Sequence, residues 1–495
     1  MPTRLIDIGH DVSALPRLIL SSNIRHPQQT KYAALSYCWG TETDAKSQFK
    51  TERTSLEHRC AGLPRELMTS TTNDAIVLAR AIGLRYLWID ALCIIQDDEN
   101  DWSHESSQMN LVYRHAYVTL CSLNSDSCHE GFLNRVPAVE IPFQSTIRKA
   151  IKGFCLIRLR PRAGINLDRR RYVWDSILSK WNRRCWTFQE KEMSTRLLLF
   201  GSLKMHFACA RSEWSEGDET VRERFTSGVT DQIIMFKDNR ISSRELYDCW
   251  ASLVHQYGHR LVTFGNDRLP AIAGLARMIG EALQDRYLAG IWEGDLLFGL
   301  AWHSQIDMLS HGLEAHVQSI RERNYVAPSW SWAACPTVGI MRPGGAYAIE
   351  ESTVMEVNTD ADSSDPYGQV SGGFLRIRGK MARMPDWIPS GEGTRWTNSW
   401  FQFLADASDD NIHVVTDWVH KGKEAGVENL VVLLLYRTEN EIEATEPELR
   451  ALLLHPADEL GTYYRVGVVS SDGYEGYREM RGWFKESQEE TICII

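Results

Sequence analysis

A carboxylate and an indole lie one helical turn apart in the segment KWNRRCWTFQEKEMS. The pattern predicts a short helix at about 179–194, and Trp186 and Glu190 stand at positions i and i+4, which share one face of a helix. Such a pair suits a sugar-containing substrate, because the ring excludes water while the carboxylate accepts ribose hydroxyls or stabilises an oxocarbenium ion. The alternative is an amphipathic helix with an ordinary surface glutamate, since such neighbours are common on helices.

Further polar and aromatic side chains lie where the sequence predicts the ends of buried strands. Ser36 and Trp39 belong to the apolar run YAALSYCWG, and Asp90 and Gln96 belong to or follow the run YLWIDALCII. In an open parallel sheet, ligands bind outside the carboxyl ends of the strands. We therefore expect these four side chains to surround a ligand, together with the helix that carries Glu190.

Several candidates also have a purely structural interpretation. Asp90 lies inside an apolar run, so it must be hydrogen-bonded or paired, and it could simply hold Ser36 or a backbone amide. Cys93 could be a nucleophile, but no neighbouring histidine supports this, and a buried thiol is the simpler interpretation. Glu105, three residues after Trp102, is either an alternative catalytic carboxylate or a surface acid in the first turn of a helix.

Alternating strands and helices must position these groups. Nearly continuous apolar runs predict strands that are buried on both faces. Their alternation with helical patterns predicts an α/β fold with βαβ units and a mainly parallel sheet flanked by helices. Two short runs near the N-terminus, RLIDI and PRLIL, could add edge strands. The predicted strands are 32–40, 86–95, 117–123 and 196–201, and the predicted helices are 64–83, 101–116 and 179–194.

Changes in composition divide the rest of the chain. We expect residues 1–212 to form the α/β domain, with an insertion at about 124–175. This insertion is rich in arginine, with Arg158, Arg160, Arg162 and Arg169 to Arg171. These side chains could bind phosphates, or the segment could be a solvated loop. Residues 213–325 have a mostly helical pattern, and residues 326–495 contain short β-type runs separated by polar breaks. We therefore expect a helical region followed by a β-rich C-terminal module.

Composition limits the classes of function. The 495 residues include 54 Lys and Arg against 65 Asp and Glu, a net charge of −11, which argues against a nucleic-acid binder. No apolar run approaches the roughly 18 residues of a membrane helix, and the N-terminus lacks a secretory signal, so we expect a cytoplasmic protein without a membrane partner. The 11 dispersed cysteines contain no CxxC pair, which favours reduced thiols over a disulfide framework or a metal site.

Four blocks of the sequence resemble, in order, the signature blocks of the fungal heterokaryon incompatibility (HET) domain. They are YAALSYCWG, LPRELMTSTTNDAIVLARAIGLRYLWIDALCIIQDD, DWSHESSQMNLVYRHAYVTLCS and RRCWTFQEKEMSTRLLLF. Downstream, DRLPAIAGLA, YLAGIWEGDLLFGLAWH, APSWSWA and ETICII look like the region that accompanies this domain. The resemblance implies a fungal cytosolic protein of nonself recognition, linked to growth arrest and programmed cell death.

The HET domain is in turn remotely similar to TIR domains, which implies a flavodoxin-like fold. Some TIR domains cleave NAD through a helix glutamate in a W-x-x-x-E spacing, and Trp186 and Glu190 stand at that spacing. The resemblance therefore implies a domain that binds a nicotinamide nucleotide and hydrolyses its glycosidic bond. In this hypothesis NAD is the substrate, Glu190 stabilises the ribosyl cation, and no metal or other cofactor is required.

The remaining candidate residues are assigned to substrate binding. Trp39 or Trp186 stacks on a base. The polar side chains that position the ribose or order Glu190 are Ser36, Asp90 and Gln96. Arg183 or Arg184 binds the pyrophosphate. Self-association is expected only by analogy with binding modules of this fold.

Two rival hypotheses stay open at this point. The first is a non-enzymatic interaction module that triggers incompatibility by recruiting a partner protein. The second is an enzyme that acts on a different small molecule in the same cleft.

Overall fold

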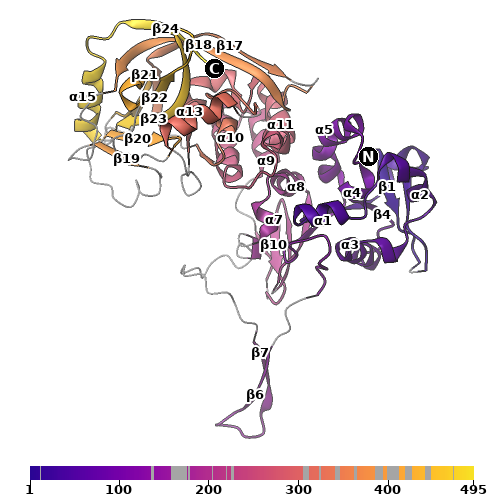
Figure 1. Cartoon of the computed structure of the whole chain (residues 1–495). Helices are drawn as coiled ribbons and strands as arrows, with labels where there is room; N and C mark the ends of the chain where they lie inside the picture. Colours follow the sequence, from indigo (N-terminus) through magenta and orange to yellow (C-terminus); the bar gives the residue numbers. More distant parts are fainter. Residues whose placement is uncertain are drawn as a thin grey trace. The chain divides into compact units, whose positions relative to one another are not determined.

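The computed structural model of the chain forms two compact units, Met1–Gly228 and Val229–Ile495 (Figure 1). Within these units the described residues are 1–11, 13–134, 139–157, 175–176, 179–202, 204–218, 220–223, 228–304, 312–322, 325–340, 346–361, 365–384, 394–397, 412–418, 426–440, 447–471 and 473–495.

The first unit contains a mixed sheet. Its described strands follow the order β11-β10-β9-β8-β5-β3-β4-β1-β2. The four central strands, β4 (Tyr86–Trp88), β3 (Tyr32–Ser36), β5 (Val118–Ser122) and β8 (Arg196–Phe200), are parallel. β3 and β5 are buried along their whole length, as expected for strands covered on both faces.

Antiparallel strands extend both sides of this parallel core. β1 (Arg4–Asp7) and β2 (Arg17–Leu20) lie beyond β4, and β9 (Met205–Cys209), β10 (Ser212–Ser215) and β11 (Arg222–Glu223) lie beyond β8. The connections from β1 to β2 and from β8 onward are too short for a crossover helix, and short connections join antiparallel neighbours. The prediction of a mainly parallel sheet was therefore wrong outside the centre, and β1 is an internal strand rather than an edge.

The parallel core has a reversal in its strand order. In chain order its strands are β3, β4, β5 and β8, yet β3 lies between β4 and β5. The carboxyl ends of β3 and β5 therefore flank a topological switch point, the position at which open α/β sheets bind ligands.

Helices connect the parallel strands. α3 (Ser70–Ala81) joins β3 to β4, and the Thr69 side chain caps its N-terminus. α5 (Glu99–His115) joins β4 to β5 and is capped by Asp98. Both caps follow the preference of Thr and Asp for this position. Two shorter helices on the path from β3 to β4 are α1 (Glu42–Ser47) and α2 (Leu56–Ala61).

Three predicted elements were wrong in their extent. The helix predicted at 64–83 begins only at Ser70, because the backbone at Met68 is extended. The run 86–95 is not a single strand, because β4 ends at Trp88 and a helical turn, α4 (Asp90–Cys93), follows. This turn is made by backbone hydrogen bonds from the Cys93 amide to the carbonyl of Ile89 (2.8 Å) and from the Ile94 amide to the carbonyl of Asp90 (3.0 Å).

The predicted helix at 179–194 is likewise two helices, α7 (Lys180–Arg183) and α8 (Trp186–Met193). Arg184 between them has an extended backbone, and its guanidinium donates to the carbonyl of Tyr37 (2.7 Å). This tertiary hydrogen bond holds the chain at the point where the helix is interrupted.

The predicted insertion contains a hairpin. Within the described part, β6 (Val139–Gln144) and β7 (Lys152–Ile157) form an antiparallel pair with each other and form no ladder with another strand (Figure 1).

The second unit begins with helices and continues with a β-rich region, as the sequence predicts. The longer described helices before residue 325 are α9 (Val229–Lys237), α10 (Ser243–Tyr257), α11 (Ala273–Leu283) and α13 (Leu313–Glu322). No described helix in either unit is both long and apolar enough to cross a membrane.

Five strands of the second unit close a ring. β18 (Val370–Arg383) pairs with β21 (Val431–Asn440), which pairs with β22 (Leu449–Pro456). β22 pairs with β23 (Thr462–Ser471), β23 with β24 (Glu489–Ile494), and β24 again with β18. Strands β16 (Ala346–Glu350), β17 (Ser352–Ala361), β19 (Thr394–Thr397) and β20 (Ile412–Thr416) extend this ring, and α15 (Gly473–Trp483) joins β23 to β24.

Candidate functional site

Three buried side chains form a hydrogen-bonded chain at the carboxyl end of β3. The Trp181 indole N–H donates to the Ser36 hydroxyl oxygen (2.6 Å), and the Ser36 hydroxyl donates to Oε2 of Glu190. Because Trp181 can only donate, it leaves the single proton of Ser36 available for the carboxylate. Glu190, on α8, is only 6% exposed.

The environment of Glu190 raises the pKa of its carboxyl group to about 7. Burial is the main cause, since removal from water disfavours the charged form, and the charge of Asp90 acts in the same direction. Hydrogen bonds from Ser36 and Tyr113 and the charge of Arg184 oppose this change. Near neutral pH both forms of Glu190 are therefore populated, which is the condition for a general acid or base.

A second carboxylate, Asp90, lies at the start of α4. It accepts hydrogen bonds from the Trp39 indole (2.8 Å) and from the Ala91 amide, and burial raises the pKa of its carboxyl group. Gln96 donates its side-chain amide to the backbone carbonyl of Asp90 (3.1 Å). Trp39, Asp90 and Gln96 are each half-buried, so they remain within reach of solvent.

The basic and aromatic candidates differ in their placement. Arg184 is half-buried, and its charge acts on both Glu190 and Asp90. Arg183, one residue earlier, is exposed. Trp186 is half-buried and meets Trp102 of α5 edge to face, with 6.5 Å between ring centroids.

The structure therefore brings Ser36, Asp90, Arg184 and Glu190 together. Trp39 joins this group by its hydrogen bond to the Asp90 carboxylate, and Gln96 by its hydrogen bond to the Asp90 backbone carbonyl.

Sequence reasoning missed two members of this group, Trp181 and Tyr113. Their aromatic character gave no sign of a polar partner, although a buried indole N–H and a buried phenol both need one.

Cys93, the alternative nucleophile, and Glu105, the alternative catalytic acid, have other roles. Burial raises the pKa of Cys93 to about 12, so the thiolate needed for attack is not available near neutral pH. Glu105 is buried rather than at the surface, which corrects the expectation for this residue. Its Oε1 lies 3.9 Å from the guanidinium of Arg4, which is also paired with Asp101, so Glu105 belongs to a separate charged cluster.

Metal ligation finds no support among the residues that the structure describes, because no group of three or more His, Cys, Asp or Glu side chains there could hold an ion. The arginines predicted to grip phosphates, from Arg158 to Arg171, lie outside the described residues.

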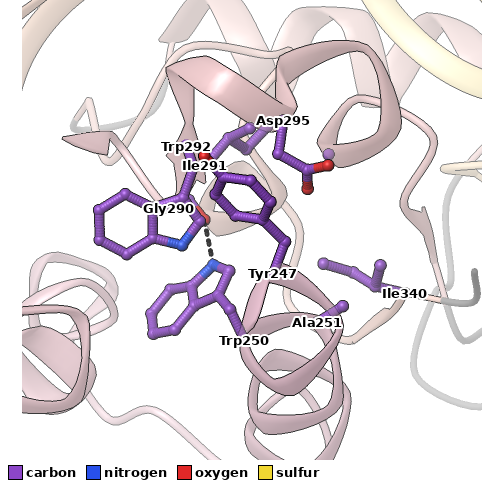
Figure 2. A pocket seen from close by; sticks show the side chains of 9 residues that line it. Tyr247, Trp250, Ala251, Gly290, Ile291, Trp292, Asp295 and Ile340 are labelled. Carbon is purple, nitrogen blue, oxygen red and sulfur yellow. Dashed lines mark hydrogen bonds between the residues drawn. The ribbon is translucent and has the colours of Figure 1, made fainter. Parts of the chain in front are cut away.

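The second unit contains a small aromatic pocket (Figure 2). The Trp250 indole donates to the carbonyl of Gly290 (2.9 Å), which also accepts from the Trp332 indole (2.8 Å). The cavity volume of about 10 Å³ accommodates about one water molecule, so it is too small for a nucleotide. Its lining residues are Tyr247, Trp250, Ala251, Gly290, Ile291, Trp292, Asp295, Gly299 and Ile340.

Comparison with known proteins identifies the region that carries the first site. Residues 32–190 match the family described as heterokaryon incompatibility protein (HET), and this stretch runs from β3 to Glu190. No curated protein and no solved structure matches the chain. The resemblance seen in the signature blocks is thus confirmed, and residues 32–190 of this chain are a heterokaryon incompatibility (HET) domain.

Proposed function

We propose that the HET domain of this chain is a nucleotide glycohydrolase that acts in heterokaryon incompatibility, with NAD as its substrate. The observation that carries the proposal is Glu190, a buried carboxyl group with a pKa of about 7 that Ser36 holds at the sheet's switch point. A nicotinamide nucleotide is the substrate class that the W-x-x-x-E spacing of Trp186 and Glu190 implies by resemblance to TIR domains.

The proposed reaction needs one well-placed carboxylate. The bond between the ribose C1′ and the nicotinamide nitrogen breaks, its electron pair leaves with neutral nicotinamide, and a ribosyl cation develops. Ionised Glu190 stabilises this cation electrostatically. Water then adds to C1′ and loses a proton to Glu190, which returns it to solvent. The products are nicotinamide, ADP-ribose and one proton.

The fold around Glu190 supports a nucleotide ligand. The order of the parallel strands, with β3 between β4 and β5, is that of flavodoxin-like sheets, which bind a nucleotide cofactor at the same switch point. Half-buried Trp39 and Trp186 offer rings for a base, and Arg184 offers a guanidinium for a pyrophosphate. Asp90 and Gln96 offer polar groups for ribose hydroxyls.

The contrast in exposure among these residues supports the proposed chemistry. Ser36, Trp181 and Glu190 are buried, whereas Trp39 and Asp90, which are hydrogen-bonded to each other, are half-buried. Exclusion of bulk water around Glu190 strengthens electrostatic stabilisation of a cation.

A non-enzymatic interaction module is the second candidate. It is favoured by the 6% exposure of Glu190 and by the hydrogen bonds that the carboxylate already receives from Ser36 and Tyr113. In this case Glu190 contributes to the fold alone, and incompatibility follows from partner recruitment.

Nicotinamide release separates these candidates. Purified full-length protein is incubated with NAD, and free nicotinamide is measured by chromatography for wild type, Glu190→Gln and the control Glu192→Gln on the same helix. We expect Glu190→Gln to lose at least about a hundredfold in rate, while Glu192→Gln retains activity. Circular dichroism checks that each variant is folded.

Three other outcomes would count against the proposal. If wild type releases no nicotinamide at any protein concentration, while Glu190→Gln still arrests growth when expressed in fungal cells, the interaction module is supported. If NAD binds without turnover, an enzyme for a different small molecule is supported. If Glu190→Gln hydrolyses NAD as fast as wild type, the assignment of Glu190 fails.

A further inference from the structure

Among the residues that the structure describes, the hairpin formed by β6 and β7 pairs with no other strand, and its surface is unusual. Its register runs from Val139 opposite Ile157 to Gln144 opposite Lys152, and all six residues of β6 are exposed. An isolated two-stranded hairpin is marginally stable in water. A hairpin that pairs with no further strand of the described residues therefore gains stability by contact with another surface.

Large apolar side chains are exposed along this hairpin and at its turn. Ile147 in the turn is 92% exposed, and Phe154 of β7 is 67% exposed. On β6, Val139, Ile141 and Phe143 alternate and share one face of the ribbon, whereas Phe154 lies opposite Pro142 and belongs to the other face. The exposed apolar residues are Val139, Ile141, Phe143, Ile147, Ile151 and Phe154. This number of exposed apolar side chains on one short hairpin marks an interaction site.

The turn that carries Ile147 is held by hydrogen bonds. The Ser145 amide donates to the carbonyl of Ile151 (3.0 Å), and the Ile151 amide donates to the carbonyl of Arg148 (2.9 Å). The Arg148 amide donates to the Ser145 hydroxyl (3.0 Å). The Ile147 side chain is thus presented to solvent by an ordered turn.

Positive charge accompanies the apolar residues. Arg148, Lys149 and Lys152 are all exposed at or beside the turn, and Glu140 is the one acidic residue between positions 139 and 157. The whole chain has a net charge of −11, so the hairpin is a local basic region on an acidic protein. Its charge is complementary to an anionic surface.

We propose that the β6–β7 hairpin docks on an anionic phospholipid membrane, with Ile147 and Phe154 entering the interface and Arg148, Lys149 and Lys152 binding the headgroups. Aliphatic side chains at an exposed tip gain by contact with acyl chains, and flanking cations gain by contact with anionic lipid. Nucleic acid fits less well, because the most exposed side chain of the hairpin, Ile147, is aliphatic and cannot stack on bases, as single-stranded recognition requires. This proposal revises the expectation of no membrane partner, which depended on the lack of a spanning helix.

Co-sedimentation with vesicles tests the proposal on the full-length protein. Binding is measured with phosphatidylcholine vesicles and with vesicles that also contain phosphatidylserine. We expect binding to the mixed vesicles only, and a loss of about a hundredfold when Arg148, Lys149 and Lys152 are all changed to Gln, because each cation near an anionic membrane contributes about fivefold.

A matched pair of substitutions tests the apolar contribution. Phe154→Ser, at a side chain that is 67% exposed, is compared with Phe264→Ser in the second unit, at one that is 70% exposed. We expect about a tenfold loss of vesicle binding for Phe154→Ser and none for Phe264→Ser. Both side chains are exposed, and circular dichroism confirms that each variant is folded.

Several results would overturn the proposal. They are equal binding to both vesicle types, wild-type binding by the triple Gln variant, and preferential binding of RNA over mixed vesicles. Concentration-dependent dimerisation that Phe154→Ser abolishes, without vesicle binding, would instead assign the hairpin to a second copy of the chain. Glu190→Gln is expected to bind vesicles like wild type, so this test is independent of the proposed enzymatic function.

Discussion

Replacing Glu190 by Gln changes how the stability of the first unit depends on pH. Glu190 is buried, and its carboxyl group receives hydrogen bonds from Ser36 and Tyr113. Gln has nearly the same shape but cannot ionise. The substitution therefore removes the cost of a buried negative charge while it keeps most of the packing.

The magnitude follows from two pKa values. The ordinary pKa of the group is 4.5, and in the folded protein it is about 7. Between these values the unfolded chain loses its proton while the folded protein keeps it, so the stability of wild type falls as pH rises. The full loss is about 3 kcal/mol, since one pKa unit corresponds to about 1.4 kcal/mol. Below pH 4.5 both states are protonated and the loss is absent.

Hydrogen exchange in urea measures this effect on the first unit alone. The free energy of unfolding is obtained from peptides that cover β3 and β5, at several pH values, for wild type, Glu190→Gln and Glu192→Gln. We expect the variant Glu190→Gln to gain about 3 kcal/mol relative to wild type between pH 4.5 and a pH well above 7, with no such trend for Glu192→Gln. A difference between wild type and Glu190→Gln that stays constant within about 1 kcal/mol over this range would refute the reasoning.

Three further perturbations have defined expectations. Ser36→Ala removes a hydrogen bond that favours ionised Glu190, so the pKa of Glu190, followed by carbon NMR, should rise by about 1 or more. Asp417→Ala leaves Arg465, its buried ion-pair partner, uncompensated, and urea unfolding of the second unit should show a loss of about 3–5 kcal/mol. Gly258→Ala places a Cβ 2.1 Å from a backbone carbonyl oxygen, so the second unit should lose about 1–3 kcal/mol in thermal unfolding.

Each of these three expectations has a control and a contrary result. A Glu190 pKa that falls in Ser36→Ala would contradict the hydrogen-bond argument. Glu356→Ala breaks the exposed pair with Arg376 and should cost less than about 1 kcal/mol, so an equal cost for Asp417→Ala would contradict the role of burial. Gly482→Ala, where a Cβ meets nothing within 4 Å, should be neutral or stabilising, and similar losses at both glycines would contradict the steric argument.

The parallel core could be predicted because its strands are continuous apolar runs. The structure has β3, β5 and β8 inside the predicted ranges 32–40, 117–123 and 196–201. The strand-end rule then directed attention to Ser36 and Asp90 without any spatial information.

Other features have no local signal. Apolar residues after Asp90 fit a strand or a buried helical turn equally well, because periodicity does not separate short examples of the two. The break at Arg184 contains neither Gly nor Pro, and the guanidinium that holds it there bonds to a carbonyl far away in the sequence. The hydrogen bond from Trp181 to Ser36 spans 145 positions, so only the folded chain reveals it.

The ring of five strands in the second unit has two short ladders. β23 and β24 are joined by two register pairs, Thr462 with Cys493 and Tyr463 with Ile494, and β18 and β21 by three, whereas β22 and β23 pair over most of their length. Every strand of the ring has a neighbour on each side, so local fraying cannot start at a free edge elsewhere. Opening of the ring is therefore expected to begin between β23 and β24, which share the fewest register pairs. When the chain is pulled, the ring should separate first at this ladder.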